Sequence, residues 1–138
     1  MVIDYRLVAA VFAPLLLGPW LPLWDDSVIA WGLSGAIVSV VSIAIVEEVI
    51  FRGGIQAWLL RKRVFKIDML GLSRANWLTS LLFAAAHVWQ HPLALVPGYL
   101  AVSLVLGYFR ERYKGIRVPM ALHAWYNLML LILPKLLA

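Results

Sequence analysis

Five apolar stretches, separated by short polar connections, dominate the hydrophobic pattern of the chain. A helix needs about 20 apolar residues to cross the roughly 30 Å hydrocarbon layer of a bilayer. The stretches run over residues 7–24, 28–60, 76–89, 93–109 and 118–133. We therefore predict an all-α fold: a polytopic transmembrane helix bundle of about five spans, forming a single membrane-embedded domain over residues 1–138.

Prolines and glycines predict where these helices bend. Pro97 and Gly98 are expected to kink the fourth span, because a proline inside a helix removes a hydrogen bond. Pro119 suits the first turn of the fifth span, where no donor is needed. Gly53 and Gly54 are expected to let the second span bend.

The composition supports a membrane protein and excludes several other classes. Hydrophobic residues make up 64% of the chain and charged residues only 14%. A soluble domain of this size needs a larger polar surface, so a soluble globular enzyme is excluded, and disorder requires low hydrophobicity. The chain has no cysteine, which excludes disulfides, thiolate metal sites and a cysteine nucleophile.

The basic residues predict the orientation in the membrane. Nine of the twelve lie in two connections, after the second and the fourth span: Arg61, Lys62, Arg63, Lys66 and Arg74, then Arg110, Arg112, Lys114 and Arg117. By the positive-inside rule both connections are cytoplasmic, which places the N-terminus inside and the C-terminus outside. The compact size favours a prokaryotic plasma membrane. The net charge of +5 comes without a basic and aromatic groove pattern, so we expect no nucleic-acid partner.

Three ionisable residues lie inside the second apolar stretch, where charge is costly. Glu48 and Arg52 are four residues apart and share one helical face, so we expect them to form an ion pair. Glu47 lies about 100° around the helix from Glu48, and one guanidinium does not easily serve both carboxylates. Glu47 is therefore predicted to face another partner and is a candidate general base.

Two further spans carry polar residues without an obvious local partner. His87 follows Phe83 by four residues in the third span, and His123 precedes Asn127 by four in the fifth. Leaving such groups apart in lipid is costly, so we expect the carboxylate, the two imidazoles and the amide to converge on one intramembrane site.

The order of these residues resembles the motifs of a known family. Glu47 to Gly53 reads EEVIFRG, Phe83 to His87 reads FAAAH, and His123 to Asn127 reads HAWYN. These segments resemble the EExxFRG, FxxxH and HxxxN motifs of the CPBP family. Its members are intramembrane glutamic endopeptidases, comprising the type II CAAX prenyl endopeptidase and the bacteriocin-processing (Abi) proteases. The resemblance implies a protease core over residues 37–138.

The resemblance also implies a mechanism for CAAX-type protein processing. Glu47 and His87 would bind and activate a water that attacks the scissile carbonyl. The two polar residues of the HxxxN motif would hold the oxyanion, because an imidazole and an amide are suitable donors. Glu48 and Arg52 would orient the site, and no cofactor would be required. The expected partners are membrane lipids and a protein or peptide substrate, which in this family can be lipidated.

Two alternatives remain open at this point. Glu47, His87 and His123 would also suit a catalytic Zn²⁺ with water in the open position, as in a zinc metalloprotease. A non-enzymatic membrane protein, either a binding or immunity protein or a proton-linked carrier, would also bury glutamate and histidine. The sequence leaves the substrate and the oligomeric state undetermined.

Overall fold

The fold is described from a computed structural model that covers residues 3–17, 32–89 and 91–136, with side chains for residues 3–15, 32–89 and 91–133. Apart from one short hairpin, every regular element in these ranges is helical, as the sequence predicts. In chain order they are α1 (Tyr5–Leu17), α2 (Gly32–Glu48), η3 (Val49–Gln56), α3 (Ala57–Leu59), η4 (Arg63–Lys66), β1 (Asp68–Met69), β2 (Leu72–Ser73), α4 (Arg74–His87), η5 (Leu93–Leu95), α5 (Val96–Arg112) and α6 (Arg117–Leu136).

The chain divides into two compact units. Unit 1 comprises Met1–Ile45 and Ala121–Ala138, and unit 2 comprises Val46–Met120. The boundaries fall within α2 and α6. The expectations of one domain over residues 1–138 and of a protease core over residues 37–138 stay predictions.

Within the residues that the structure describes, two helical runs are long and apolar enough to cross a membrane. They are Gly32–Leu59, which joins α2, η3 and α3 over 28 residues, and Leu93–Arg112, which has 20 residues. Helix α4 has 14 residues and covers about 21 Å, less than the hydrocarbon thickness. The first predicted span, residues 7–24, overlaps α1. Residues 18–24 of this span and residues 28–31 of the second predicted span lie outside the described residues. The count of about five spans stays a prediction.

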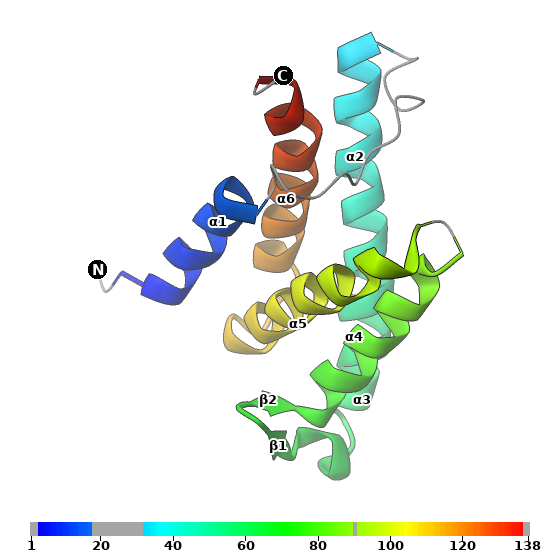
Figure 1. Ribbon diagram of the computed structural model, residues 1–138. Helices are drawn as coiled ribbons and strands as arrows, with labels where there is room; N and C mark the ends of the chain where they lie inside the picture. Colours follow the sequence, from blue (N-terminus) through cyan, green and yellow to red (C-terminus); the bar gives the residue numbers. More distant parts are fainter. Residues whose placement is uncertain (1–2, 18–31, 90, 137–138) are drawn as a thin grey trace. The chain divides into compact units, whose positions relative to one another are not determined.

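Helix α6 packs against α2 and α1 in unit 1 (Figure 1). Ala36 and Val40 are fully buried against Leu131. In α1, Pro14 has no N–H, so the carbonyl four residues earlier lacks its usual intrahelical donor. That carbonyl belongs to Ala10, and the buried Tyr126 hydroxyl donates to it at 3.0 Å. The proline that weakens α1 thereby provides an attachment point for α6.

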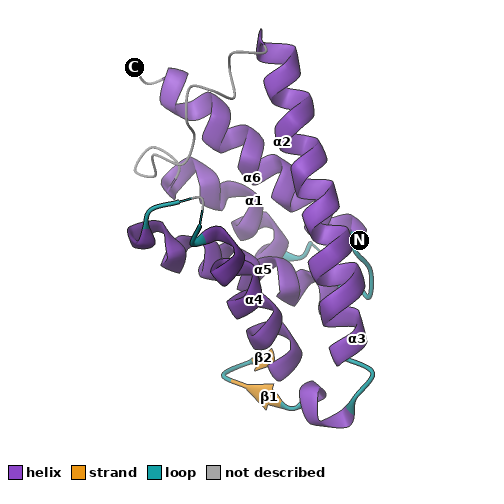
Figure 2. Cartoon of the chain, turned by 90° about the vertical axis from the view of Figure 1, so that its right-hand side faces the viewer, coloured by secondary structure: helices purple, strands orange, loops and turns teal. Residues whose placement is uncertain are grey.

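Helices α4 and α5 pack side by side in unit 2, and η3 packs against both (Figure 2). A Cβ on Gly107 of α5 would lie 2.5 Å from Asn76 Cγ, a distance that side chains do not adopt. Glycine is therefore required where α5 meets the buried Asn76 side chain of α4.

The second span widens into a π-helix over Val49–Gln56. A Cβ on Gly53 would approach the Glu48 carbonyl, and one on Gly54 would approach the Val49 carbonyl, each five residues back along the chain. The i→i+5 pairing of a π-helix brings these groups together. The sequence predicts a bend at the two glycines. The structure instead has wider turns, a form found often at functional sites.

The predicted kink at Pro97 and Gly98 is wrong. The structure has a 3₁₀ turn over Leu93–Leu95, and α5 begins at Val96, so Pro97 lies in the first turn of α5. The first N–H groups of a helix have no intrahelical acceptor, so proline costs nothing there. Pro119, by contrast, lies in the first turn of α6, as predicted.

Candidate active site

The predicted pair of Glu48 and Arg52 is confirmed. Arg52 Nη1 donates to Glu48 Oε1 at 2.8 Å, and both side chains are fully buried. The other terminal nitrogen of Arg52 donates to the carbonyl oxygen and to the Oγ of Ser103, at 3.0 and 2.8 Å. The two terminal nitrogens of the guanidinium therefore bind Glu48 and Ser103 at the same time and join η3 to α5. A lysine, with a single terminal nitrogen, would not do this.

A buried polar network continues from this pair along α4 and α5. Ser103 Oγ donates to Ser80 Oγ at 3.0 Å, and Ser80 Oγ donates to Asn76 Oδ1 at 3.1 Å. Gln56 Nε2 donates to the Gly107 carbonyl at 3.1 Å. Gln56 Nε2 also donates to Glu111 Oε1, at 2.8 Å. These bonds give acceptors to the donors Arg52 Nη2, Gln56 Nε2, Ser80 Oγ and Ser103 Oγ, which would otherwise be costly in an apolar surrounding.

Sequence reasoning missed most of this network, although a signal was present. The polar or small residues recur every fourth position on three helices, as one face of a helix requires. They are Glu48, Arg52 and Gln56 on the second span, Asn76 and Ser80 on α4, and Ser103, Gly107 and Glu111 on α5.

Glu47 lies beside His87, a partner other than the Glu48–Arg52 pair, as its position around the helix predicts. His87 Nε2 lies 3.6 Å from Glu47 Oε1, and the two side chains are 15% and 23% exposed. His87 Nδ1 lies 2.8 Å from the Phe83 carbonyl, which only accepts, so Nδ1 is the protonated nitrogen. In the neutral ring, Nε2 therefore presents a lone pair on the side of the glutamate.

Aromatic rings hold His87 in this orientation. Tyr99 stacks on His87 with ring centroids 4.5 Å apart and planes 25° apart. Phe83 is buried and contacts the other residues of the motifs: its centroid lies 5.0 Å from the Phe51 ring and 5.0 Å from Arg52 Cζ. Phe83 therefore packs against residues of the first motif. Tyr99 was missed, because a single tyrosine in an apolar span carries no periodic signal.

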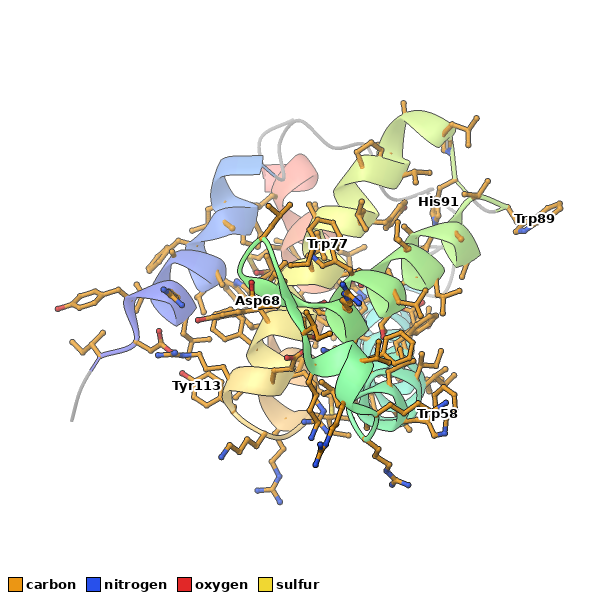
Figure 3. The ribbon with its side chains drawn as sticks, turned by 90° about the horizontal axis from the view of Figure 1, so that it is seen from below. Trp58, Asp68, Trp77, Trp89, His91 and Tyr113 are labelled. Carbon is orange, nitrogen blue, oxygen red and sulfur yellow. The ribbon has the colours of Figure 1, made fainter. Side chains whose placement is uncertain are left out.

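His91 follows His87 by one turn and lies beyond the end of α4 (Figure 3). Its ring centroid is 5.2 Å from that of Tyr99 and 6.0 Å from that of His87. Partial burial and the neighbouring His87 lower the pKa of His91 below its ordinary value of 6.5. His91 therefore favours the neutral form and adds no positive charge beside His87.

The third predicted pair lies in unit 1, on α6. His123 is 5% exposed, and Asn127 Nδ2 donates to the Val40 carbonyl of α2 at 3.2 Å. The amide of Asn127 is therefore oriented by α2. The convergence of this pair with Glu47 and His87, which lie in unit 2, stays a prediction.

In the part of the chain that the structure describes, no three His, Asp or Glu side chains form a group that would hold a metal ion. Glu47 and His87 are of the residue types that bind catalytic zinc, which takes three protein ligands.

A family model described as "Type II CAAX prenyl endopeptidase Rce1-like" matches residues 29–129. This range covers about three quarters of the chain and contains all six predicted site residues: Glu47, Glu48, Arg52, His87, His123 and Asn127. Comparisons with curated proteins and with solved structures give no match.

Proposed function

Because the chain belongs to the Rce1-like family of type II CAAX prenyl endopeptidases, we propose that it is a glutamate-dependent intramembrane endopeptidase. Membership makes it a membrane-associated peptidase with a protein substrate. The proposal adds the mechanism and the residues that carry it out. The observation that carries it is the approach of Glu47 Oε1 to His87 Nε2, with His87 Nδ1 held by the Phe83 carbonyl.

Glu47 and His87 suit the activation of water. At 3.6 Å the two atoms are too far apart for a direct hydrogen bond, but one water can lie within hydrogen-bond distance of both. The carboxylate accepts one proton of this water, and the Nε2 lone pair accepts the other. The oxygen is then free to attack the scissile carbonyl carbon while Glu47 takes up the proton as general base.

The remaining motif residues support this step. Glu48 and Arg52 form an ion pair and hold η3 against α5. His123 and Asn127 supply the donors for the oxyanion in this proposal. Asparagine has two amide hydrogens, so Asn127 keeps one for the substrate while the other is donated to Val40.

We propose a membrane-anchored protein as substrate, with a prenylated C-terminus as the first to test. In this proposal the basic connections 61–74 and 110–117 face the cytoplasm, as the positive-inside rule favours, with the N-terminus inside and the C-terminus outside.

The experiment compares the wild type with Glu47→Gln in vesicles that contain a fluorogenic farnesylated CAAX peptide. The amide keeps the size of the side chain but is a poor base, so we expect cleavage to be lost while thermal unfolding is unchanged. Asp68→Asn is the matched control: it removes an exposed carboxylate, and asparagine still accepts from the Gly71 N–H. Equal cleavage by Glu47→Gln and the wild type would overturn the mechanism. If Glu47→Gln lost cleavage but kept the function that the protein has in its cell, a binding or immunity protein would be favoured.

Zinc is tested in the same assay. Activity that persists after exhaustive chelation excludes the metalloprotease alternative. Loss of activity that zinc alone restores would support Glu47, His87 and His123 as ligands.

A further inference from the structure

The connection between α3 and α4, residues 61–73, combines positive charge with exposed apolar side chains. Four cations lie within six positions, and four large apolar residues of the same connection are 43–87% exposed. The cations are Arg61, Lys62, Arg63 and Lys66, and the apolar residues are Val64, Ile67, Met69 and Leu70. A connection that faces only water is expected to be polar.

Leu70 lies at the tip of the β1–β2 hairpin and is 87% exposed. Leu70 and Gly71 have φ of 58° and 80°, the conformation of a type I′ turn, in which asparagine, aspartate or glycine is preferred. A leucine at the first of these positions is disfavoured by backbone sterics and by exposure to water. Neither the turn conformation nor burial in the core explains why a leucine occupies this position. We therefore look for an apolar environment outside the chain.

The hairpin is held in place by polar contacts. The Asp68 carboxylate accepts from the Gly71 N–H at 2.9 Å and closes the turn. The Trp77 indole of α4 donates to the Met69 carbonyl at 2.9 Å, and Figure 3 shows Trp77 beside the hairpin. The β1–β2 hairpin is therefore held at the end of unit 2 where α3 ends and α4 begins (Figure 2).

The apolar run Gly32–Leu59 ends two residues before Arg61, and at about 42 Å it is longer than the hydrocarbon layer, so the connection lies outside that layer. Trp58 is 53% exposed, and Lys62 Nζ lies 3.9 Å from the centre of its ring. A tryptophan beside a basic residue at the end of a span is typical of the membrane interface. In the described part of the chain, none of the four cations pairs with a carboxylate.

We propose that residues 61–73 form an interfacial docking element for anionic phospholipids of the same leaflet. The four cations bind the headgroup phosphates, and Leu70 enters the boundary between headgroups and acyl chains. The occupant is the protein's own bilayer, because the preceding span ends against it, and the charge is complementary. Through Trp77 the docked hairpin fixes the start of α4, the helix that carries His87. This inference rests on membrane insertion and does not depend on peptidase activity.

The absence of cysteine allows the test to report on single positions. Leu70→Cys and Lys114→Cys, each labelled with an environment-sensitive fluorophore, are compared in phosphatidylcholine vesicles with and without phosphatidylglycerol. Lys114 is a matched control, because it is also exposed and has a φ of 53°. We expect a blue shift and quenching by lipid-attached quenchers that are stronger at position 70 than at position 114, and that increase with phosphatidylglycerol at position 70. Water-like emission at both positions would overturn the proposal and leave a soluble protein as the partner of this surface.

Two variants separate headgroup binding from folding. In detergent, added phosphatidylglycerol should raise the melting temperature of the wild type, and this rise should be at least halved in Arg63→Gln/Lys66→Gln and in Leu70→Asn. Asparagine suits the left-handed conformation better than leucine, so Leu70→Asn should be at least as stable as the wild type without lipid. An unchanged lipid-induced rise in both variants would contradict the assignment of headgroup binding to this connection.

Discussion

The contact between Gly107 and Asn76 provides a sharp test of the packing in unit 2. In Gly107→Ala, the new Cβ would lie 2.5 Å from Asn76 Cγ and 3.0 Å from Asn76 Nδ2. Asn76 is 1% exposed, donates to the Leu104 carbonyl at 3.0 Å and accepts from Ser80 at 3.1 Å. The methyl group therefore forces Asn76 to move and breaks these hydrogen bonds, or forces α4 and α5 apart.

The size of the effect follows from two contributions. Overpacking a buried contact costs about 1–3 kcal/mol. Leaving a buried polar group without its partner costs about 1–3 kcal/mol more. We expect Gly107→Ala to lower the free energy of unfolding by about 2–6 kcal/mol, against the slight gain that alanine usually brings to a helix.

The assay is a double-mutant cycle measured by SDS titration in detergent micelles, followed by tryptophan fluorescence. In an Asn76→Ala background the methyl group of Gly107→Ala has room, so its cost should fall below about 1 kcal/mol. Gly98→Ala is the matched control. Gly98 lies in the same helix as Gly107, and a Cβ added there would meet no neighbouring atom within 4 Å. An equal cost of Gly107→Ala in both backgrounds would refute the steric reasoning.

Three further predictions concern the site. Arg52→Met leaves the buried Glu48 charge uncompensated and should cost about 3–5 kcal/mol in the same titration, whereas Glu48→Leu/Arg52→Met should recover most of it. Tyr99→Phe keeps the stack on His87 and should keep activity, whereas Tyr99→Ala should lower kcat about three- to ten-fold with little change in KM, as expected for an aromatic contact of about 0.5–1.5 kcal/mol. The lowered pKa of His91 means that the unfolded chain binds its proton more tightly, so stability should fall as the pH drops below about 6.5. His91→Gln should flatten that dependence of the melting temperature, and an unchanged pH profile would contradict this assignment.

The sequence alone predicted much of the local structure. Apolar stretches long enough to span a membrane gave the helical class, and spacing of four residues gave the pair of Glu48 and Arg52. The angle between adjacent helical positions also separated Glu47 from that pair. These features depend on periodicity within one segment, which the order of residues determines directly.

Other features of the structure could not be predicted from the periodicity of a single segment. The sequence predicted a kink at Pro97 where the structure begins a helix, because the start of a helix depends on which backbone donors have partners. It did not predict that Tyr99 stacks on His87 or that Ser103 accepts from Arg52. Each of these contacts joins residues from different helices.

The difference between what the sequence predicted and what the tertiary structure decided has a simple physical reason. Sequence periodicity fixes the angle at which a side chain leaves its own helix, so it determined that Glu47 and Glu48 point in different directions. Only the packing of one helix on another decides which group occupies that direction. In unit 2 that packing, which depends on Gly107 having no side chain and on the wider turns of η3, brings His87 Nε2 to Glu47.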